Sequence, residues 1–306
     1  MKSRRDRLAV LGAALATAVV AAGTAAGMAH ALADPAPAAR PVFSATTPSI
    51  PAASKGTVEA VVSKPAVDHD ALLATAMAGV PVGGKARVSV AVLDMAGGDR
   101  AVYGDGTGFD TASIVKVDIL AVLLLQAQDA GRELTAAEKA YATAMIKWSD
   151  NASASALWDT IGGAAALDAG NARFGLTDTR GGESWGLTQT TAADQLVLLE
   201  QVFGSGSLLG ADARAYVRGL MEGIAAGQHW GVSAVADGDA WALKNGWLPR
   251  SATGLWDINS VGRVTVDGRE YLVAVLSDGN VSQQAGISVV EKAARAAVSV
   301  FAGTPA

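Results

Sequence analysis

Two polar residues in a long apolar segment give the first sign of chemistry. Ser113 and Lys116 stand three positions apart in FDTASIVKVDILAVLLLQ, which is otherwise typical of a buried helix. Residues at i and i+3 share one face of a helix, so the hydroxyl and the amine would lie together. Burial disfavours the charged form of a lysine and lowers its pKa. A neutral Lys116 could then take the proton of Ser113 and make that hydroxyl a nucleophile.

The same segment also allows a purely structural interpretation. Thr111 is placed to cap the helix, which would leave Ser113 in the first turn, where free backbone N–H groups suit a developing oxyanion. In the alternative, Ser113 only supports the start of the helix and Lys116 extends its charged end to solvent. The Ser-x-x-Lys spacing alone does not decide between these interpretations.

A second polar group, Ser149-Asp150-Asn151, interrupts two apolar helical segments. Ser149 could pass a proton to a leaving group, and Asn151 could hydrogen-bond a substrate amide. Asp150 is suited to cap the helix that follows it. A helix–helix turn with a good cap is the alternative.

A third group, Lys244-Asn245-Gly246, lies in the strand-like segment WALKNGW. A lysine on an edge strand can hold an anionic substrate group, and Gly246 would allow a substrate backbone to approach closely. The backbone N–H of Trp247 could donate to an oxyanion. Asn-Gly is also the strongest short-range hairpin signal, so the alternative is a simple turn at Asn245-Gly246.

The surrounding pattern predicts the elements that must position these groups. A helical segment at 70–80 precedes an alternating strand at 86–97 and a return strand at 101–104. Helical patterns fill the middle of the chain, and Thr135 with Glu138 predicts a capping box there. Three strand patterns at 241–247, 254–266 and 269–278 precede a closing helix at 281–301. We expect a mixed α/β fold: one antiparallel sheet covered by the terminal helices, a helical lobe, and a site between the two.

Composition narrows the chemistry further. The chain has 306 residues, a net charge of −5, no cysteine and three histidines. A nucleic-acid binder normally presents a basic face, so we expect no nucleic acid as partner. Without cysteine there is no thiolate nucleophile and no iron–sulfur site, and a histidine-rich metal site is disfavoured. We expect no cofactor and no metal, and a monomer that acts on a small molecule or peptide.

The N-terminal segment is typical of an export signal. MKSRRDR is basic, residues 8–27 are apolar, and AHALAD provides small residues before a cleavage site after Ala33. The Arg4-Arg5 pair resembles a twin-arginine signal. We therefore predict a signal peptide at 1–33, a Pro- and Ala-rich flexible linker at 34–67 and a folded domain at 68–303. The mature protein would be extracytoplasmic with no membrane span; an uncleaved anchor is the alternative.

In this order, SIVK, SDN and KNG resemble the three motifs of the penicillin-recognising serine enzymes, which include the class A β-lactamases and the D-alanyl-D-alanine peptidases. SDNASASALWDTIGG is similar to the class A continuation of the second motif, and the resemblance covers about residues 68–301. It implies a five-stranded antiparallel sheet covered by helices, with a helical lobe. It also implies these roles: Ser113 as acylated nucleophile, Lys116 as base, Ser149 as proton relay, Asn151 and Lys244 as substrate-binding groups, and the N–H groups of Ser113 and Trp247 as oxyanion hole.

Three departures from the family pattern bear on function. Asn245 stands where the family has a Thr or Ser that donates to the substrate carboxylate, so we expect Asn245, with Gly246 and Trp247, to contact substrate through a different donor. The first two motifs are only 36 positions apart. The Glu-x-x-Leu-Asn motif that supplies the base for deacylation is not found. Glu183 in ESWGL is the nearest carboxylate, and it fits a solvated loop better. An acyl-enzyme would therefore persist.

These departures leave three hypotheses. The chain is an exported β-lactamase-like serine hydrolase, a D-alanyl-D-alanine carboxypeptidase or transpeptidase, or an impaired relative that only binds wall fragments.

Outside the motifs, we expect His229 to pack beside Trp230 instead of acting as a base. Tryptophans flank the motifs, and they predict either an aromatic groove or core packing.

Overall fold

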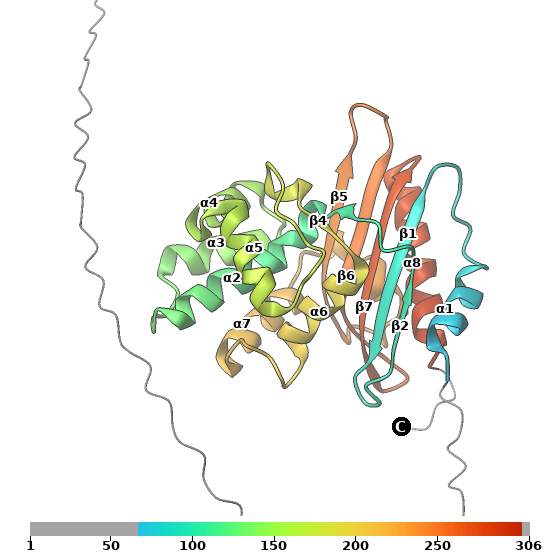
Figure 1. Cartoon of the computed structure of the whole chain (residues 1–306), viewed down its shortest axis with the longest axis horizontal. Coiled ribbons are helices and arrows are strands. Elements are labelled where there is room, and N and C mark those ends of the chain that lie inside the picture. The colour runs from blue at the N-terminus through green and yellow to red at the C-terminus, as the bar shows by residue number, and fades with distance from the viewer. Residues whose placement is uncertain (1–66, 302–306) are drawn as a thin grey trace, which may run out of the picture. The chain divides into compact units, whose positions relative to one another are not determined.

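A five-stranded antiparallel sheet forms the centre of the molecule in the computed structural model, which describes residues 67–301 (Figure 1). The predicted signal peptide and almost all of the predicted linker lie outside the described residues. The strand order is β2-β1-β7-β6-β5. The strands are β1 (Arg87–Asp94), β2 (Arg100–Tyr103), β5 (Trp241–Pro249), β6 (Trp256–Val266) and β7 (Arg269–Asn280). Early strand β1 pairs with late strand β7, so both ends of the domain build one sheet, as predicted.

The terminal helices α1 (His69–Met77) and α8 (Gln283–Ser299) cover one face of the sheet (Figure 1). Strand β1 shows how both faces are buried. Val88, Val90 and Val92 join the apolar cluster under the terminal helices, whereas Ala91 and Leu93 join the cluster of the helical lobe. The predicted alternation of this strand is confirmed, with apolar side chains on both sides.

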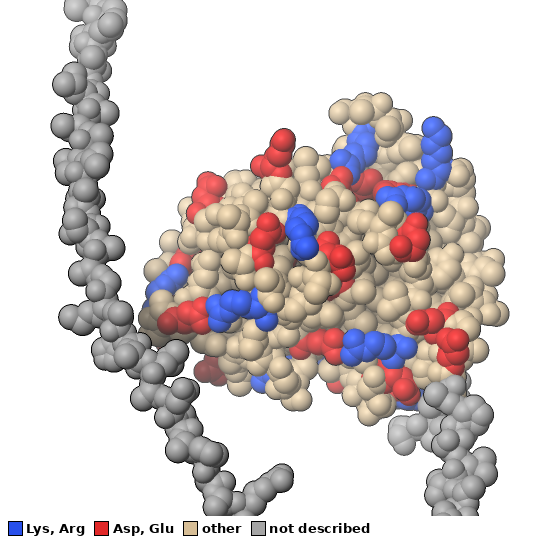
Figure 2. All heavy atoms as spheres, viewed as in Figure 1, with Lys and Arg blue, Asp and Glu red and all other residues tan. Residues whose placement is uncertain are grey.

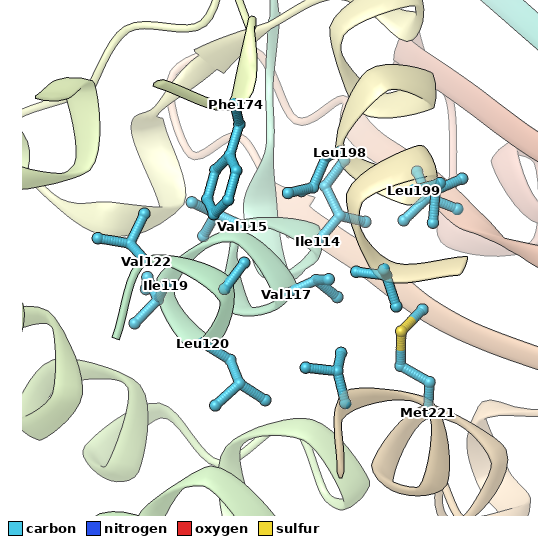
Figure 3. Packing of buried hydrophobic residues seen from close by; sticks show 14 of the residues in the cluster. Ile114, Val115, Val117, Ile119, Leu120, Val122, Phe174, Leu198, Leu199 and Met221 are labelled. Atoms are coloured by element: carbon cyan, nitrogen blue, oxygen red, sulfur yellow. The ribbon is translucent and has the colours of Figure 1, made fainter. Parts of the chain in front are cut away.

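The helical lobe packs on the other face around α2 (Val115–Asp129). Residues 115–125 of α2 are all buried. Figure 3 shows Ile114, which directly precedes α2, and Val117 of α2 on the side of that helix that faces Leu198, Leu199 and Met221. The other helices of the lobe are α3 (Ala136–Lys147), α4 (Asn151–Ile161), α5 (Gly163–Phe174), α6 (Ala192–Phe203), which carries Leu198 and Leu199, and α7 (Ala211–Glu222), which carries Met221. A helix that is apolar all round belongs in a core, so α2 is the centre of this lobe.

Local signals account for several element boundaries. The predicted capping box is present at α3: the Thr135 side chain accepts from Glu138 N, and the Glu138 carboxylate accepts from Thr135 N. Asp267 and Gly268, both at positive φ, form the turn between β6 and β7. Two short strands, β3 (Phe109–Asp110) and β4 (Gln189–Thr190), pair beside the start of α2. Within residues 67–301, no helix combines the length and apolarity needed to cross a bilayer.

Acidic and basic side chains are interspersed over the visible face of the domain, without a continuous basic area (Figure 2).

One carboxyl group is enclosed in the helical lobe. Asp118 on α2 is fully buried, and burial raises its pKa to about 7, with Asp168 and Asp194 adding to the effect. The Asn171 amide donates to Asp118 Oδ2 over 3.1 Å. Asp118 Oδ1 and Asn171 Oδ1 are both buried without a partner. A protonated Asp118 would carry no charge in this buried site, so the environment of the side chain favours the neutral acid.

We expect Asp118 to make the domain less stable as pH rises from about 4 to about 7. The unfolded carboxyl ionises near 3.8, whereas the folded group keeps its proton to about 7. The folded state therefore binds more protons in this window, and the free energy of unfolding falls as pH rises. The gap between the two pKa values corresponds to roughly 4 kcal/mol at most. Asp118→Asn replaces the titrating carboxyl with a neutral amide of similar shape and should remove this loss, as urea unfolding at pH 5 and pH 8 would measure.

Asp129→Asn provides the matched control. Asp129 lies at the exposed end of the same helix beside Arg173, whose hydrogen bond lowers the pKa of that carboxyl. This variant should retain the loss of stability between pH 5 and pH 8. If Asp118→Asn retained it as well, the buried acid would not be its source.

Candidate active site

Ser113 lies in a tight turn before α2, not in the first turn of that helix. A 3-10 turn, η1 (Ala112–Ile114), precedes α2, and the Thr111 side chain makes no capping hydrogen bond, so the predicted Thr111 cap is wrong. Thr111 Oγ1 instead donates to the carbonyl oxygen of Trp185 over 3.4 Å. Ala112 has a φ of 47°, in the left-handed region that non-glycine residues seldom adopt. Strain of this kind persists where the surrounding structure enforces it.

Two strands of the sheet hold this turn in place. The Asn259 amide on β6 donates to the carbonyl oxygens of Asp110 (2.9 Å) and Thr111 (3.0 Å). Gly246 on β5 passes so close that a Cβ there would lie 2.8 Å from Thr111 O and 3.0 Å from Ser113 N. Gly246 was predicted to allow a close approach by a substrate backbone. The backbone that approaches Gly246 in the structure is that of Thr111 and Ser113 in the same chain. Asn259 was missed, although a polar residue in a buried strand was a usable signal.

Lys116 is completely buried, which excludes the alternative of an amine that extends to solvent. Its Nζ donates to Ser149 O (2.7 Å), Asn151 Oδ1 (2.8 Å) and Ser149 Oγ (3.2 Å). Burial lowers the pKa of this amine to about 8, against an opposing effect of Asp150. The Nζ also lies 4.7 Å from the centre of the Trp185 ring. Lys116 is therefore an amine that can lose its proton near neutral pH.

Ser149 joins the first motif to the third. Its φ is 57°, and its Oγ lies 3.2 Å from Lys116 Nζ and 3.0 Å from Lys244 Nζ. Asp150 caps α4 through Ser153 N, as predicted, and Asn151 begins that helix. The Ser149-Asp150-Asn151 segment is thus both a capped helix start and a group of polar atoms around a buried amine.

Lys244 is also completely buried and donates to Asn245 O (2.8 Å), Ser149 Oγ (3.0 Å) and Gln228 Oε1 (3.5 Å). Burial lowers its pKa well below the usual value, and the charge of Lys116 lowers it further. Among the ion pairs of residues 67–301, none pairs either lysine with a carboxylate. Two buried amines around one hydroxyl, neither in a salt bridge with a carboxylate, favour neutral amines or a bound anion.

Asn245 lies in mid-strand opposite Ser260, so the alternative of a hairpin turn at Asn245-Gly246 is wrong. Its side chain is fully buried: Nδ2 donates to the carbonyl oxygens of Gln228 (2.7 Å) and Trp230 (3.0 Å), and Oδ1 accepts from Ser260 Oγ (2.6 Å). Both amide hydrogens are used. In this arrangement Asn245 fixes the 228–230 segment to the sheet and has no hydrogen left for the substrate contact that its position in the motif predicted.

The motif residues meet at a pocket of about 480 Å³ between the helical lobe and the sheet. The pocket is lined by Ala112, Ser113, Trp148, Ser149, Asn151, Ser184, Trp185, Gly186, Leu187, Trp247 and Leu248. None of these residues is ionisable. Glu183 is exposed and outside the lining, and a larger hollow of about 830 Å³ beside α1 and β2 contains none of the three motifs. Within the described residues, no cluster of His, Asp and Glu could hold a metal ion.

Aromatic residues divide between the pocket and the core. Trp148 and Trp185 line the pocket, whereas Trp241 is buried under the sheet. The His229 ring packs edge-on against Trp241 at 4.6 Å, and its Nε2 lies 3.2 Å from Ile224 O. A packing role for His229 is confirmed, with Trp241 as its aromatic partner in place of Trp230. Both the groove and the core interpretations of the tryptophans therefore hold, for different residues.

Comparison with solved structures supports the same fold. A class A beta-lactamase from Bacteroides cellulosilyticus has a TM-score of 0.66 at 16% identity, covering 77% of this chain and 99% of its own. TLA-1 extended spectrum beta-lactamase has a TM-score of 0.68 at 15% identity, with coverage of 77% and 99%. A PBP-A mutant, in an acyl-enzyme complex with penicillin G, has a TM-score of 0.64 at 19% identity, with coverage of 76% and 96%. No curated protein matches the chain.

The fold and the family match place this chain in the penicillin-recognising serine hydrolase superfamily. The model of the beta-lactamase enzyme family matches residues 125–301, more than half of the chain, so the protein belongs to that family. The matched segment includes the second and third motifs and begins after Ser113 and Lys116.

Gly246→Ala should destabilise the domain, because the added Cβ would meet backbone atoms of Thr111 and Ser113, which cannot rotate away. Overpacking of this kind costs about 1–3 kcal/mol of unfolding free energy. Urea denaturation measures the change. Gly219→Ala on α7 is the control, because a Cβ there meets no atom within 4 Å and alanine favours a helix. Equal effects of the two substitutions would contradict the close approach of β5.

Proposed function

We propose that this protein is an exported serine hydrolase that transfers acyl groups through Ser113, on β-lactams or related peptide amides. One observation carries the proposal: three motif side chains line one pocket and two motif lysines bond to that lining from behind, although 131 positions separate the first residue from the last. They are Ser113, Lys116, Ser149, Asn151 and Lys244. Chance Ser-x-x-Lys spacing does not account for that convergence.

In the first step, neutral Lys116 takes the proton of the Ser113 hydroxyl while Oγ attacks the carbonyl carbon of the substrate. Burial, which lowers the pKa of Lys116 to about 8, provides the neutral amine at a useful pH. Catalytic hydrogen bonds often tighten only with substrate bound, so the absence of a Lys116–Ser113 hydrogen bond among the described residues does not exclude this step. The carbonyl oxygen becomes an oxyanion that the N–H groups of Ser113 and Trp247 would receive.

In the second step, the carbon–nitrogen bond breaks and the leaving nitrogen needs a proton. Ser149 Oγ is within 3.2 Å of both lysine amines and also lines the pocket. The hydroxyl can therefore give its proton to the leaving nitrogen and regain one from the Lys116 ammonium formed in the first step. Lys244, which has no carboxylate partner, would steady the substrate carboxylate and Ser149. Asn151 would hold the substrate amide.

A specific observation favours a second candidate, a D-alanyl-D-alanine carboxypeptidase or transpeptidase. The pocket lining contains no carboxylate that could activate water, Glu183 is exposed outside it, and the Trp185 ring covers Lys116. An acyl-enzyme without a base to activate water is long-lived and available to an amine acceptor. A secreted enzyme of this type would act on cell-wall stem peptides and be inhibited by penicillin, whereas rapid hydrolysis would make it an agent of antibiotic resistance.

Incubation with benzylpenicillin should increase the mass of the mature protein by one penicillin molecule, because Ser113 opens the lactam ring and retains the whole molecule. Intact-protein mass spectrometry detects the adduct, and peptide mapping places it. Ser113→Ala should form none. Ser299→Ala, whose hydroxyl only contacts the end of α8, should react like the wild type.

The lifetime of the adduct distinguishes the candidates. An adduct that persists after removal of free penicillin supports the peptidase, and rapid loss with release of penicilloate supports the β-lactamase. A folded wild-type protein that forms no adduct would leave only the non-catalytic wall-binding relative.

The rate of acylation should rise with pH and level off above about 8, because the reactive form of Lys116 is the neutral amine and burial sets its pKa there. Roughly a tenfold gain is expected between pH 7 and pH 9. Quenched-flow mass spectrometry of adduct formation measures it. Lys139→Met removes an exposed amine beside Glu133 and should leave the midpoint unchanged. A rate that falls across this range would reject neutral Lys116 as the base.

A further inference from the structure

We propose that the wall of the pocket beside Ser113 is a subsite for an uncharged, aromatic side chain on the acyl group that is transferred. The inference rests on the proposed acyl transfer and specifies its substrate. The wall is made of Trp148, Trp185 and Leu187, and we call it the tryptophan wall.

Two residues of the tryptophan wall, Trp148 and Leu187, are apolar side chains exposed at the pocket. Trp148 is 62% exposed and Leu187 is 38% exposed, although both are large and apolar. Single exposed apolar residues are ordinary on a protein surface. Here two of them come from distant segments and line the same pocket as Ser113. Apolar surface gathered at a pocket beside a nucleophile is typical of ligand contact.

The Trp185 part of the tryptophan wall is held in place before substrate binds. Trp185 Nε1 donates to Ser155 Oγ on α4 over 3.2 Å, and the Trp185 carbonyl oxygen accepts from Thr111. The loop that carries Trp185 is anchored further back, where Asp168 accepts from Gly181 N over 2.7 Å and Asp194 accepts from Asp178 N over 2.8 Å. A preformed aromatic surface binds a flat ring without a large ordering cost.

The absence of charge in the pocket lining favours an uncharged substrate side chain. The pocket lining has no ionisable side chain, so nothing in it can pair with a charged substituent. Behind the lining, neither Lys116 nor Lys244 is paired with a carboxylate, so no acidic member of an ion pair is present there to attract an added ammonium. An added carboxylate would lose water against indole rings without a matched donor, which is costly. The wall therefore favours an uncharged ring over a cationic or anionic side chain.

Three penicillins test the charge argument, because they share a phenyl ring and differ only in the substituent on the adjoining carbon. Benzylpenicillin has hydrogen there, ampicillin an ammonium and carbenicillin a carboxylate. We expect benzylpenicillin to acylate Ser113 fastest, by about tenfold or more in the second-order rate constant, as is usual for discrimination by an apolar pocket. Equal rates for all three would overturn the inference.

A ratio of rates tests the wall itself. The benzylpenicillin rate divided by the rate for 6-acetamidopenicillanic acid, which keeps the side-chain amide and lacks the phenyl ring, isolates the contribution of the ring. Trp148→Ala should reduce this ratio severalfold. Tyr141→Ala is the matched control, because Tyr141 is an exposed aromatic residue of α3 outside the pocket, and it should leave the ratio unchanged.

The outcomes separate the two levels of the proposal. If no penicillin acylates the folded wild type, the proposed acyl transfer fails. If all of them acylate Ser113, but the ratio is small in the wild type or is unaffected by Trp148→Ala, acyl transfer stands and the tryptophan wall is not a side-chain subsite.

Discussion

The buried amine of Lys116 is the constraint on which the rest of the site depends. An ammonium taken out of water is costly unless acceptors surround it or it loses its proton, and α2 places this one at the centre of an apolar lobe. The break between α3 and α4 supplies the acceptors, Ser149 O, Ser149 Oγ and Asn151 Oδ1. Three short polar residues between two helices thus satisfy a charge and bring a second hydroxyl to the pocket.

Strained backbone accompanies this arrangement. Among residues 67–301, three non-glycine residues have positive φ, and two of them, Ala112 and Ser149, lie at the site. Both are held by neighbours that cannot easily yield: Asn259 and Gly246 fix the turn before Ser113, while the two lysine amines converge on Ser149. Such strain costs on the order of 1–3 kcal/mol per residue and is kept where position matters more than stability.

The chain keeps the family's fold and its cluster of Ser and Lys side chains, but it changes what surrounds them. Asn245 is part of the scaffold, bonded to Gln228, Trp230 and Ser260. The Trp185 ring covers the amine of Lys116, and the pocket lining contains no carboxylate. The lining of the pocket is therefore rich in aromatic side chains and free of acidic ones, and the proposed long-lived acyl-enzyme depends on this feature.

The sequence by itself determined the order of elements and the three motifs, because alternation in 86–97, the continuous apolar run of α2 and the Thr135 capping box are local signals. The hairpin alternative at Asn245-Gly246 stayed open, since a two-residue pattern cannot show that both residues pair with β6 in the middle of a continuous strand. It also placed a helix cap at Thr111, whereas contacts with Trp185 and Asn259, distant in sequence, impose a 3-10 turn there. The burial of both lysines, the common position of Ser149 and the aromatic wall arise only when the lobe packs on the sheet, because each requires residues that lie far apart along the chain.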